Sequence, residues 1–142
     1  MRLPRFTLAV MAAALFSTPV LAERLNTVPA ITNPVVKKEC GACHMAYQPK
    51  FLGASTWDKI LGDLSHHFGE DASLPPQTVD TIKAYYDANA GDSLPGLLRI
   101  TQQSWWLMRH GGVGHTRFAA AKSKANCLAC HKNADKGEYP LD

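Results

Sequence analysis

Cysteine is scarce in this sequence and absent outside two short motifs. Only four cysteines occur in 142 residues, namely Cys40, Cys43, Cys127 and Cys130. Each pair has the spacing C-x-x-C and is followed directly by a histidine, so no cysteine is left for a structural disulfide elsewhere. The fold therefore cannot depend on a disulfide framework, and the sulfurs must serve the two motifs themselves.

Two further patterns are missing. After residue 22 no apolar segment reaches the roughly 20 residues that a membrane-spanning helix needs. No basic run is interleaved with aromatic residues, a pattern that is common in segments that bind nucleic acid. We therefore expect no membrane span in the mature protein and no nucleic-acid partner.

The first 22 residues have the order of a secretory signal peptide. A basic start is followed by an alanine-rich apolar run to Phe16 and by small residues before the first acid. A retained membrane anchor is disfavoured, because the apolar run is short and is interrupted by Pro19. We predict cleavage after Ala22 and export of residues 23–142 to the periplasm.

The predicted mature chain carries its charge unevenly. Its formal charge is +1, because the leader holds two arginines and no acid of a chain whose total is +3. Residues 23–57 contain four basic and two acidic residues. Residues 58–95 contain two basic and seven acidic residues, and residues 96–142 contain seven basic and three acidic residues. An ordinary solvated surface would explain this, but the basic C-terminal part also favours steering of an acidic partner. The basic residues concerned are Arg109, Arg117, Lys122, Lys124, Lys132 and Lys136.

The two motifs are the pentapeptides Cys40–His44 and Cys127–His131. In a helical turn, positions i, i+3 and i+4 share one face, so two sulfurs and an imidazole can converge on one object. C-x-x-C-H is the attachment signature of c-type haem, in which the cysteines form thioethers and the histidine binds the iron. The sequence therefore predicts two covalently attached haem c groups. Attachment is expected at Cys40, Cys43, Cys127 and Cys130, and proximal iron ligation at His44 and His131.

Two other chemistries use paired cysteines. One C-x-x-C pair can form a redox disulfide, and two pairs together can build a four-cysteine zinc cage. Neither requires a histidine directly after both pairs, so haem attachment is the favoured interpretation.

The pattern along the mature chain is mainly helical, with no convincing strand. Asn33-Pro34 has the composition of a helix start, with an N-cap and a proline at the first helical position. The expected helices run from Pro34 into the first motif, from Ser55 to Phe68, from Pro75 to a stop at Gly91, from Thr101 to Arg109, and roughly from Ala119 to His131. The turn at residues 93–96 is expected to divide the chain into an N-terminal haem domain, 23–93, and a C-terminal haem-binding part, 94–142.

The sixth ligand of each iron decides the chemistry. Methionine raises the reduction potential, a second histidine gives a lower one, and an open position can bind oxygen or peroxide. Only Met45 and Met108 remain after the predicted cleavage, and Met45 directly follows the proximal His44. It cannot reach the far face of the same haem, so at most one haem can be His/Met.

Histidine candidates for the first haem lie in the second expected helix. With Trp57 at zero and about 100° per residue, His67 falls at about 280°, beside Ile60 near 300°, and His66 at about 180°. His67 thus lies on the apolar side and is the predicted ligand, with His66 as the fallback.

Candidates for the second haem lie just upstream of its own motif. His110 comes one turn after Trp106, so the same helical face could carry an aromatic ring and a ligand. His110 is the favoured ligand, while His115, beyond a glycine-rich loop, and Met108 remain alternatives.

These features resemble the small periplasmic dihaem cytochromes c known as DHC, over nearly all of the mature chain. The resemblance is carried by the segments Cys40–His44, the helix with Trp57, Leu64–Ala72 (LSHHFGEDA), Trp105-Trp106 leading to Arg109-His110, and Cys127–His131 followed by Gly137. It implies a class I cytochrome c-like N-terminal part, a smaller C-terminal part and bis-histidine ligation, with His67 and His110 in the distal positions. The glycine-rich run after His110 and the additional His115 depart from the family pattern.

The resemblance also implies a function. The expected role is an electron shuttle, not an enzyme, between a membrane cytochrome b as donor and a soluble monohaem, oxygen-binding cytochrome as acceptor. A gas-binding or peroxidatic protein with one open iron, and a subunit of a periplasmic reductase, are the alternatives. Tandem class I cytochromes fit poorly, because only 11 residues follow His131. The small dihaem subunit of periplasmic nitrate reductase has motifs closer together than the 87 residues between Cys40 and Cys127.

Overall fold

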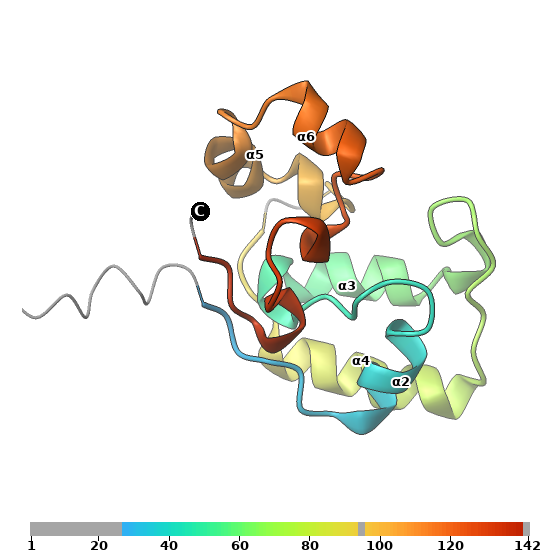
Figure 1. Ribbon diagram of the computed structural model, residues 1–142. Helices are drawn as coiled ribbons and strands as arrows, with labels where there is room; N and C mark the ends of the chain where they lie inside the picture. Colours follow the sequence, from blue (N-terminus) through green and yellow to red (C-terminus); the bar gives the residue numbers. More distant parts are fainter. Residues whose placement is uncertain (1–26, 94–95, 141–142) are drawn as a thin grey trace, which may run out of the picture.

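The computed structural model describes residues 27–93 and 96–140, and within them the fold is helical (Figure 1). The α-helices are α2 (Pro34–Cys40), α3 (Ala54–Leu61), α4 (Pro76–Asn89), α5 (Ser104–His110) and α6 (His115–Ala120). Short 3₁₀ turns are η2 (Pro49–Phe51), η3 (Leu64–His66), η4 (Ile100–Gln102), η5 (Cys127–Ala129) and η6 (Ala134–Lys136). These described residues form two isolated β-bridges and no strand, so the predicted mainly α fold is confirmed.

Two of the sequence predictions concern residues outside the part of the chain that the structure describes. The predicted signal peptide, residues 1–22, lies outside the described part of the chain. The predicted boundary between the two haem-binding parts follows residue 93 and is next to residues 94–95, which also lie outside the described part of the chain. Within residues 27–93 and 96–140, no helix has the length and apolar character needed to cross a membrane.

Helix α2 begins where the sequence predicts and leads to the first motif. The Asn33 side chain caps it, since Oδ1 accepts hydrogen bonds from the backbone N–H groups of Val35 at 2.9 Å and Val36 at 3.2 Å. The helix ends at Cys40, and the chain then turns at Gly41, where a Cβ would overlap the Lys37 carbonyl. The first motif is therefore the turn that follows α2.

The hydrophobic core lies mostly in the first half of the chain. Helices α3 and α4 lie side by side and bury Trp57, Ile60, Ile82 and Tyr86, with Trp57 and Tyr86 ring centroids 4.4 Å apart. The Trp57 indole N–H donates to the Pro49 carbonyl at 2.8 Å, so this large ring is buried without an unpaired donor. Each such side chain contributes about 1.5–3 kcal/mol when fully buried.

Helix α3 ends earlier than predicted. It stops at Leu61, with Gly62 donating to the Asp58 carbonyl, and the predicted extension to Phe68 is wrong. Beyond it the Asp63 carboxylate bonds to the Ser65 hydroxyl at 3.1 Å and to the His66 ring at 2.8 Å. Local side-chain bonds of this kind compete with helix propagation, which explains the early stop.

The last predicted helix is also wrong. Helix α6 covers His115–Ala120 and ends before Lys122, whose φ of 63° is left-handed. The Asn126 amide then donates to the Ala121 carbonyl at 3.1 Å and stabilises the turn. The second motif consequently begins in the short turn η5, and His115 opens a helix instead of lying in a loop.

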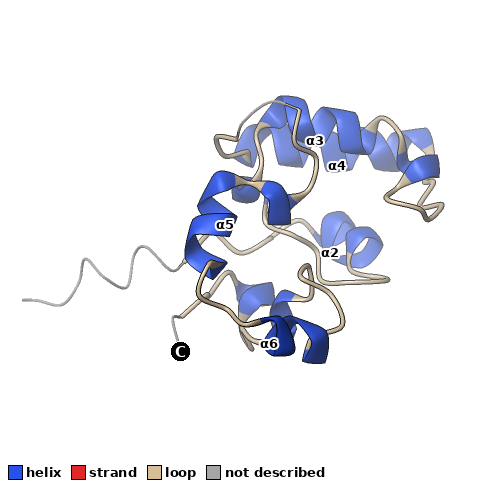
Figure 2. Ribbon diagram, turned by 90° about the horizontal axis from the view of Figure 1, so that it is seen from above, coloured by secondary structure: helices blue, strands red, loops and turns tan. Residues whose placement is uncertain are grey.

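The C-terminal segment returns to pack on the N-terminal half. The fully buried Gln48 amide donates to the Ala134 carbonyl at 2.6 Å, and its Oε1 accepts from the Tyr139 hydroxyl at 2.6 Å. The Tyr47 hydroxyl donates to the Ala125 carbonyl at 2.7 Å. Figure 2 shows α3 and α4 at one end of the molecule and α6 at the other. Residues 46–51 thus form a seam between the two motif-bearing halves.

Candidate haem sites

The structure arranges four of the histidines as two facing pairs. The ring centroids of His44 and His67 are 6.2 Å apart, and those of His110 and His131 are also 6.2 Å apart. Metal–nitrogen bonds of about 2 Å on opposite sides of an ion place two imidazole centroids roughly 6 Å apart. Each gap therefore has the width that one iron with two axial histidines requires.

His44 is oriented by its backbone and by an aromatic neighbour. Its Nδ1 lies 2.7 Å from the Met45 carbonyl, and because a carbonyl only accepts, Nδ1 must carry the proton. That tautomer leaves the Nε2 lone pair for a metal. The ring stacks on Tyr47, with centroids 4.8 Å apart and planes at 23°.

His67 occupies a tight turn after η3. The next residue, Phe68, has a φ of 54° and Gly69 a φ of 110°, and Glu70 donates to the His67 carbonyl at 3.1 Å. The Phe68 ring packs edge-on against the imidazole at 5.0 Å. This turn, and not the predicted helical face, directs His67 toward His44.

The surroundings of His67 suit a neutral metal ligand. Burial lowers its pKa, and the nearby His44 lowers it further, so the imidazole is held in the uncharged form that metals bind. Its Nδ1 is buried and has no hydrogen-bond partner in the described part of the chain. A buried polar atom without such a partner indicates a group that the polypeptide itself does not supply.

His66, the fallback, faces away from the site. Its ring is exposed and lies 2.8 Å from the Asp63 carboxylate, a hydrogen bond that raises the pKa of His66. Its position follows from the surface turn η3, and its partner is an exposed carboxylate. Of the two adjacent histidines, His67 is therefore the one that faces His44.

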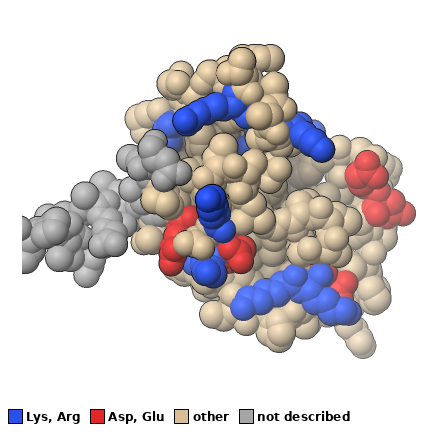
Figure 3. All heavy atoms as spheres, in the orientation of Figure 1, with Lys and Arg blue, Asp and Glu red and all other residues tan. Residues whose placement is uncertain are grey.

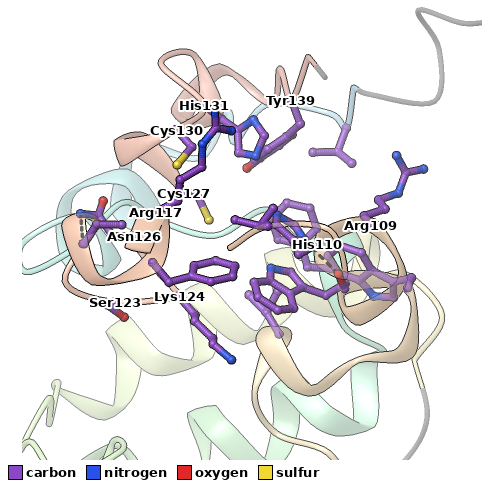
Figure 4. Close-up of a pocket in the computed structure, with 18 of the residues that line it drawn as sticks. Arg109, His110, Arg117, Ser123, Lys124, Asn126, Cys127, Cys130, His131 and Tyr139 are labelled. Atoms are coloured by element: carbon purple, nitrogen blue, oxygen red, sulfur yellow. Dashed lines mark hydrogen bonds between the residues drawn. The ribbon is translucent and has the colours of Figure 1, made fainter. Parts of the chain in front are cut away.

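The second pair lines a cavity of about 440 Å³, shown in Figure 4. This volume lies within the range of small-molecule and cofactor pockets. His110 and His131 approach it from opposite sides, and the sulfurs of Cys127 and Cys130 lie near His131. The wall also contains aromatic and cationic side chains, which are Trp105, Trp106, Phe118, Tyr139, Arg109, Arg117 and Lys124. A flat, largely apolar group with carboxylates, such as haem, matches this lining.

His110 is held at the end of α5. Its Nδ1 donates to the Trp106 carbonyl one turn earlier at 2.9 Å, so Nε2 is again left for a metal. The imidazole stacks on the buried Trp106 indole, with centroids 4.1 Å apart and planes at 12°. The predicted one-turn relation between these two residues is present in the structure.

The two alternative ligands lie elsewhere. Met108 is 79% exposed on the outer side of α5, and His115 is exposed at the start of α6. Neither lines the cavity that contains both His110 and His131.

One cysteine of each motif has surroundings that favour neutral sulfur. All four cysteines are free, and burial raises the pKa of the Cys40 thiol and that of the Cys127 thiol, the latter to about 11. Zinc binding and thiol–disulfide exchange need thiolates, which burial disfavours at Cys40 and Cys127, whereas thioethers are uncharged. Throughout the described residues no group of three or more His, Cys, Asp or Glu side chains is placed to hold a metal ion, so the zinc cage gains no support.

Sequence reasoning missed several residues beside the two pairs. Tyr47 stacks on His44, and Tyr139 packs against His131 with ring centroids 5.4 Å apart. Burial raises the pKa of Tyr47 to about 12, so its hydroxyl remains a donor at neutral pH. The available signal was an aromatic residue close after each motif, which alone does not distinguish a site residue from a core residue.

Comparisons with known proteins agree on one family. A family model described as dihaem cytochrome c matches residues 36–139. A crystal structure of DHC purified from Rhodobacter sphaeroides is 40% identical, with a TM-score of 0.73 over 78% of this chain and 99% of that chain. A dihaem cytochrome c of type DHC from Shewanella baltica is 33% identical, with a TM-score of 0.69 over 76% of this chain and 87% of that one. Among curated proteins, no match reaches significance.

Proposed function

The chain belongs to the dihaem cytochrome c family, and from this premise we propose that it is a periplasmic electron-transfer protein with two histidine ligands on each iron. The family carries two covalently bound haem c groups. A bound haem iron takes up and releases one electron at a time. The observation that carries the proposal is the pair of equal 6.2 Å separations between facing imidazoles.

Specific residues would hold each haem. Thioether attachment is assigned to Cys40 and Cys43 for the first haem, and to Cys127 and Cys130 for the second. Axial ligation is assigned to His44 with His67, and to His131 with His110. The cavity lining supports the second set, and the half-buried His67 ring, which faces His44, supports the first.

Hydrogen bonds and burial tune the proposed ligands. The Nδ1 protons of His44 and His110 are donated to backbone carbonyls, which fixes the rings and raises their basicity as ligands. Two histidine ligands give a lower potential than a histidine and a methionine. With both axial positions filled, no iron has an open site for oxygen or peroxide, so we propose an electron carrier and not an enzyme.

The partners and the location complete the proposal. As donor we propose a membrane cytochrome b and as acceptor a soluble monohaem cytochrome, the partner classes that the family resemblance implies. Residues 1–22 are proposed to be removed after Ala22 in the periplasm. The remaining chain is proposed to comprise the N-terminal haem domain, 23–93, and the C-terminal haem-binding part, 94–142.

The proposal is tested on the purified haem-loaded protein. We expect only low-spin absorption and EPR signals, together with no rapid carbon monoxide binding after reduction. A high-spin haem or rapid carbon monoxide binding would favour the gas-binding or peroxidatic alternative. A stable stoichiometric complex with a reductase during size-exclusion chromatography of a periplasmic extract would favour the subunit alternative.

A further inference from the structure

The C-terminal half has a continuous excess of positive charge. Between Asp92 and Asp135 the sequence contains no aspartate or glutamate but six basic residues, which are Arg99, Arg109, Arg117, Lys122, Lys124 and Lys132. All six are exposed. Figure 3 shows blue without red over α5 and α6, at the top of the view. A surface whose charged groups are all positive attracts negatively charged partners.

Haem carboxylates cannot cancel this excess. A haem has two propionates, and Arg109, Arg117 and Lys124 line the second cavity, where propionates could meet them. Lys122 and Lys132 are exposed and do not line that cavity. Since the segment offers no acidic side chain of its own, positive charge remains on the outer surface.

Helix α5 and the second motif also carry exposed apolar side chains. Leu107, Met108 and Leu128 are exposed by 52%, 79% and 41%. Leu128 stands between the two cysteines of the second motif, and Cys130 is itself exposed, so a haem attached there would have this edge close to solvent. An apolar centre with a charged rim is a common composition of protein–protein interfaces.

The side of the molecule near His67 has the opposite charge. Residues 58–95 contain seven acids and two basic residues, and Glu70 and Asp71 follow directly after the His67 turn. Figure 3 shows the red surface at the right of the view, over the loop between α3 and α4. An acidic partner would be repelled there, so charge disfavours an approach from the side of His67.

We propose that the surface formed by α5, α6 and the second motif is a docking site for an acidic, soluble redox protein that exchanges electrons with the second haem. This inference rests on the proposed electron-transfer function and adds to it the place of docking and the charge of the partner. The dipolar charge distribution would orient the encounter and increase its rate at low salt.

The test uses plastocyanin, an acidic soluble copper protein, as the probe. The reduced haem-loaded protein passes one electron to copper(II), giving ferric haem and copper(I), and the second-order rate constant is measured by stopped flow. Lys122→Glu/Lys132→Glu should lower this constant about tenfold or more at about 10 mM salt, where the Debye length is about 30 Å. The loss should largely disappear at about 1 M salt, where that length is about 3 Å.

The matched control places the same charge change on the other half. Lys37 and Lys59 are exposed on α2 and α3, and Lys37→Glu/Lys59→Glu should change the constant by no more than about twofold. Equal losses in both double variants, or no loss in either, would overturn the docking site. Unchanged low-spin spectra and thermal unfolding in both variants separate these outcomes from misfolding. Failure of the proposed function would look different, as a high-spin haem or absent electron transfer in the unaltered protein.

Discussion

The imidazole planes of His110 and His131 are nearly perpendicular, at 86°, whereas those of His44 and His67 are nearly parallel, at 17°. Two parallel imidazoles both interact with the same one of the two iron dπ orbitals, so the energies of the two orbitals become different. Perpendicular imidazoles act on both orbitals alike and leave them nearly equal in energy. The two haems, although bound by the same ligand types, should therefore be electronically different.

The first prediction follows from these angles. The ferric haem-loaded protein should give two overlapping low-spin EPR signals, one rhombic from the His44/His67 site and one strongly anisotropic from the His110/His131 site. Low-temperature EPR of the oxidised protein checks this. Two identical rhombic signals would show that the second pair does not keep its perpendicular arrangement.

The second prediction distinguishes His67 from its neighbour. His67→Ala removes the ring that faces His44 at 6.2 Å, so one haem should become high-spin and bind carbon monoxide when reduced. His66→Ala removes an exposed ring that bonds to Asp63 and Ser65, and both haems should stay low-spin. Absorption spectra of the two variants decide the question, and the reverse result would assign the ligand to His66.

The third prediction concerns the second haem. His110→Ala should convert one haem to the high-spin state, because the ring that faces His131 is lost. His115→Ala and Met108→Leu alter exposed side chains outside the cavity and should leave both spectra unchanged. Low-spin spectra in the His110 variant, with a change in either control, would move the ligand to the residue whose replacement matters.

Several local features predicted from the sequence are present, although two of the predicted helices have other bounds. Motif spacing predicts two attachment turns, and the Asn33 cap and the one-turn relation of Trp106 to His110 are present in the structure. His67 faces His44, although the helix assumed in preferring it to His66 ends at Leu61. The observed orientation comes from the Asp63 hydrogen bonds and the left-handed Phe68, which a helical wheel does not represent.

The seam between the halves could not be predicted from the sequence. Its hydrogen bonds join residues 78 positions apart in the pair Tyr47 and Ala125, and 91 apart in the pair Gln48 and Tyr139. Hydrophobic periodicity reports only neighbours within a helix or strand. A buried glutamine between two loops leaves no periodic signal, and its role appears only when the chain is folded.

The fourth prediction tests that seam. Gln48→Leu removes the buried amide that bonds to both the Ala134 carbonyl and the Tyr139 hydroxyl. Because these two groups can still bond to each other at 3.0 Å, the free energy of unfolding should fall by about 1.5 kcal/mol. Gln77→Leu makes the same change at an exposed position of α4 and should shift stability by less than about 0.5 kcal/mol. Denaturant unfolding of the haem-loaded variants measures both. Equal small effects would show that the Gln48 bonds do not hold the halves together.

The last prediction concerns the residue at which the C-terminal segment meets the start of the described chain. Gly137 has a φ of 82°, and its carbonyl accepts a hydrogen bond from the Val28 N–H at 2.8 Å. A Cβ there would overlap the Val28 carbonyl, and a backbone atom cannot move aside as a flexible side chain can. Gly137→Ala should therefore destabilise the protein by about 3 kcal/mol, combining left-handed strain with the clash. Gly112→Ala is the matched control, because its Cβ would meet nothing within 4 Å, and thermal unfolding should barely change. If both variants unfold at the same temperature as the unaltered protein, residues 27–30 do not pack on Gly137 in solution.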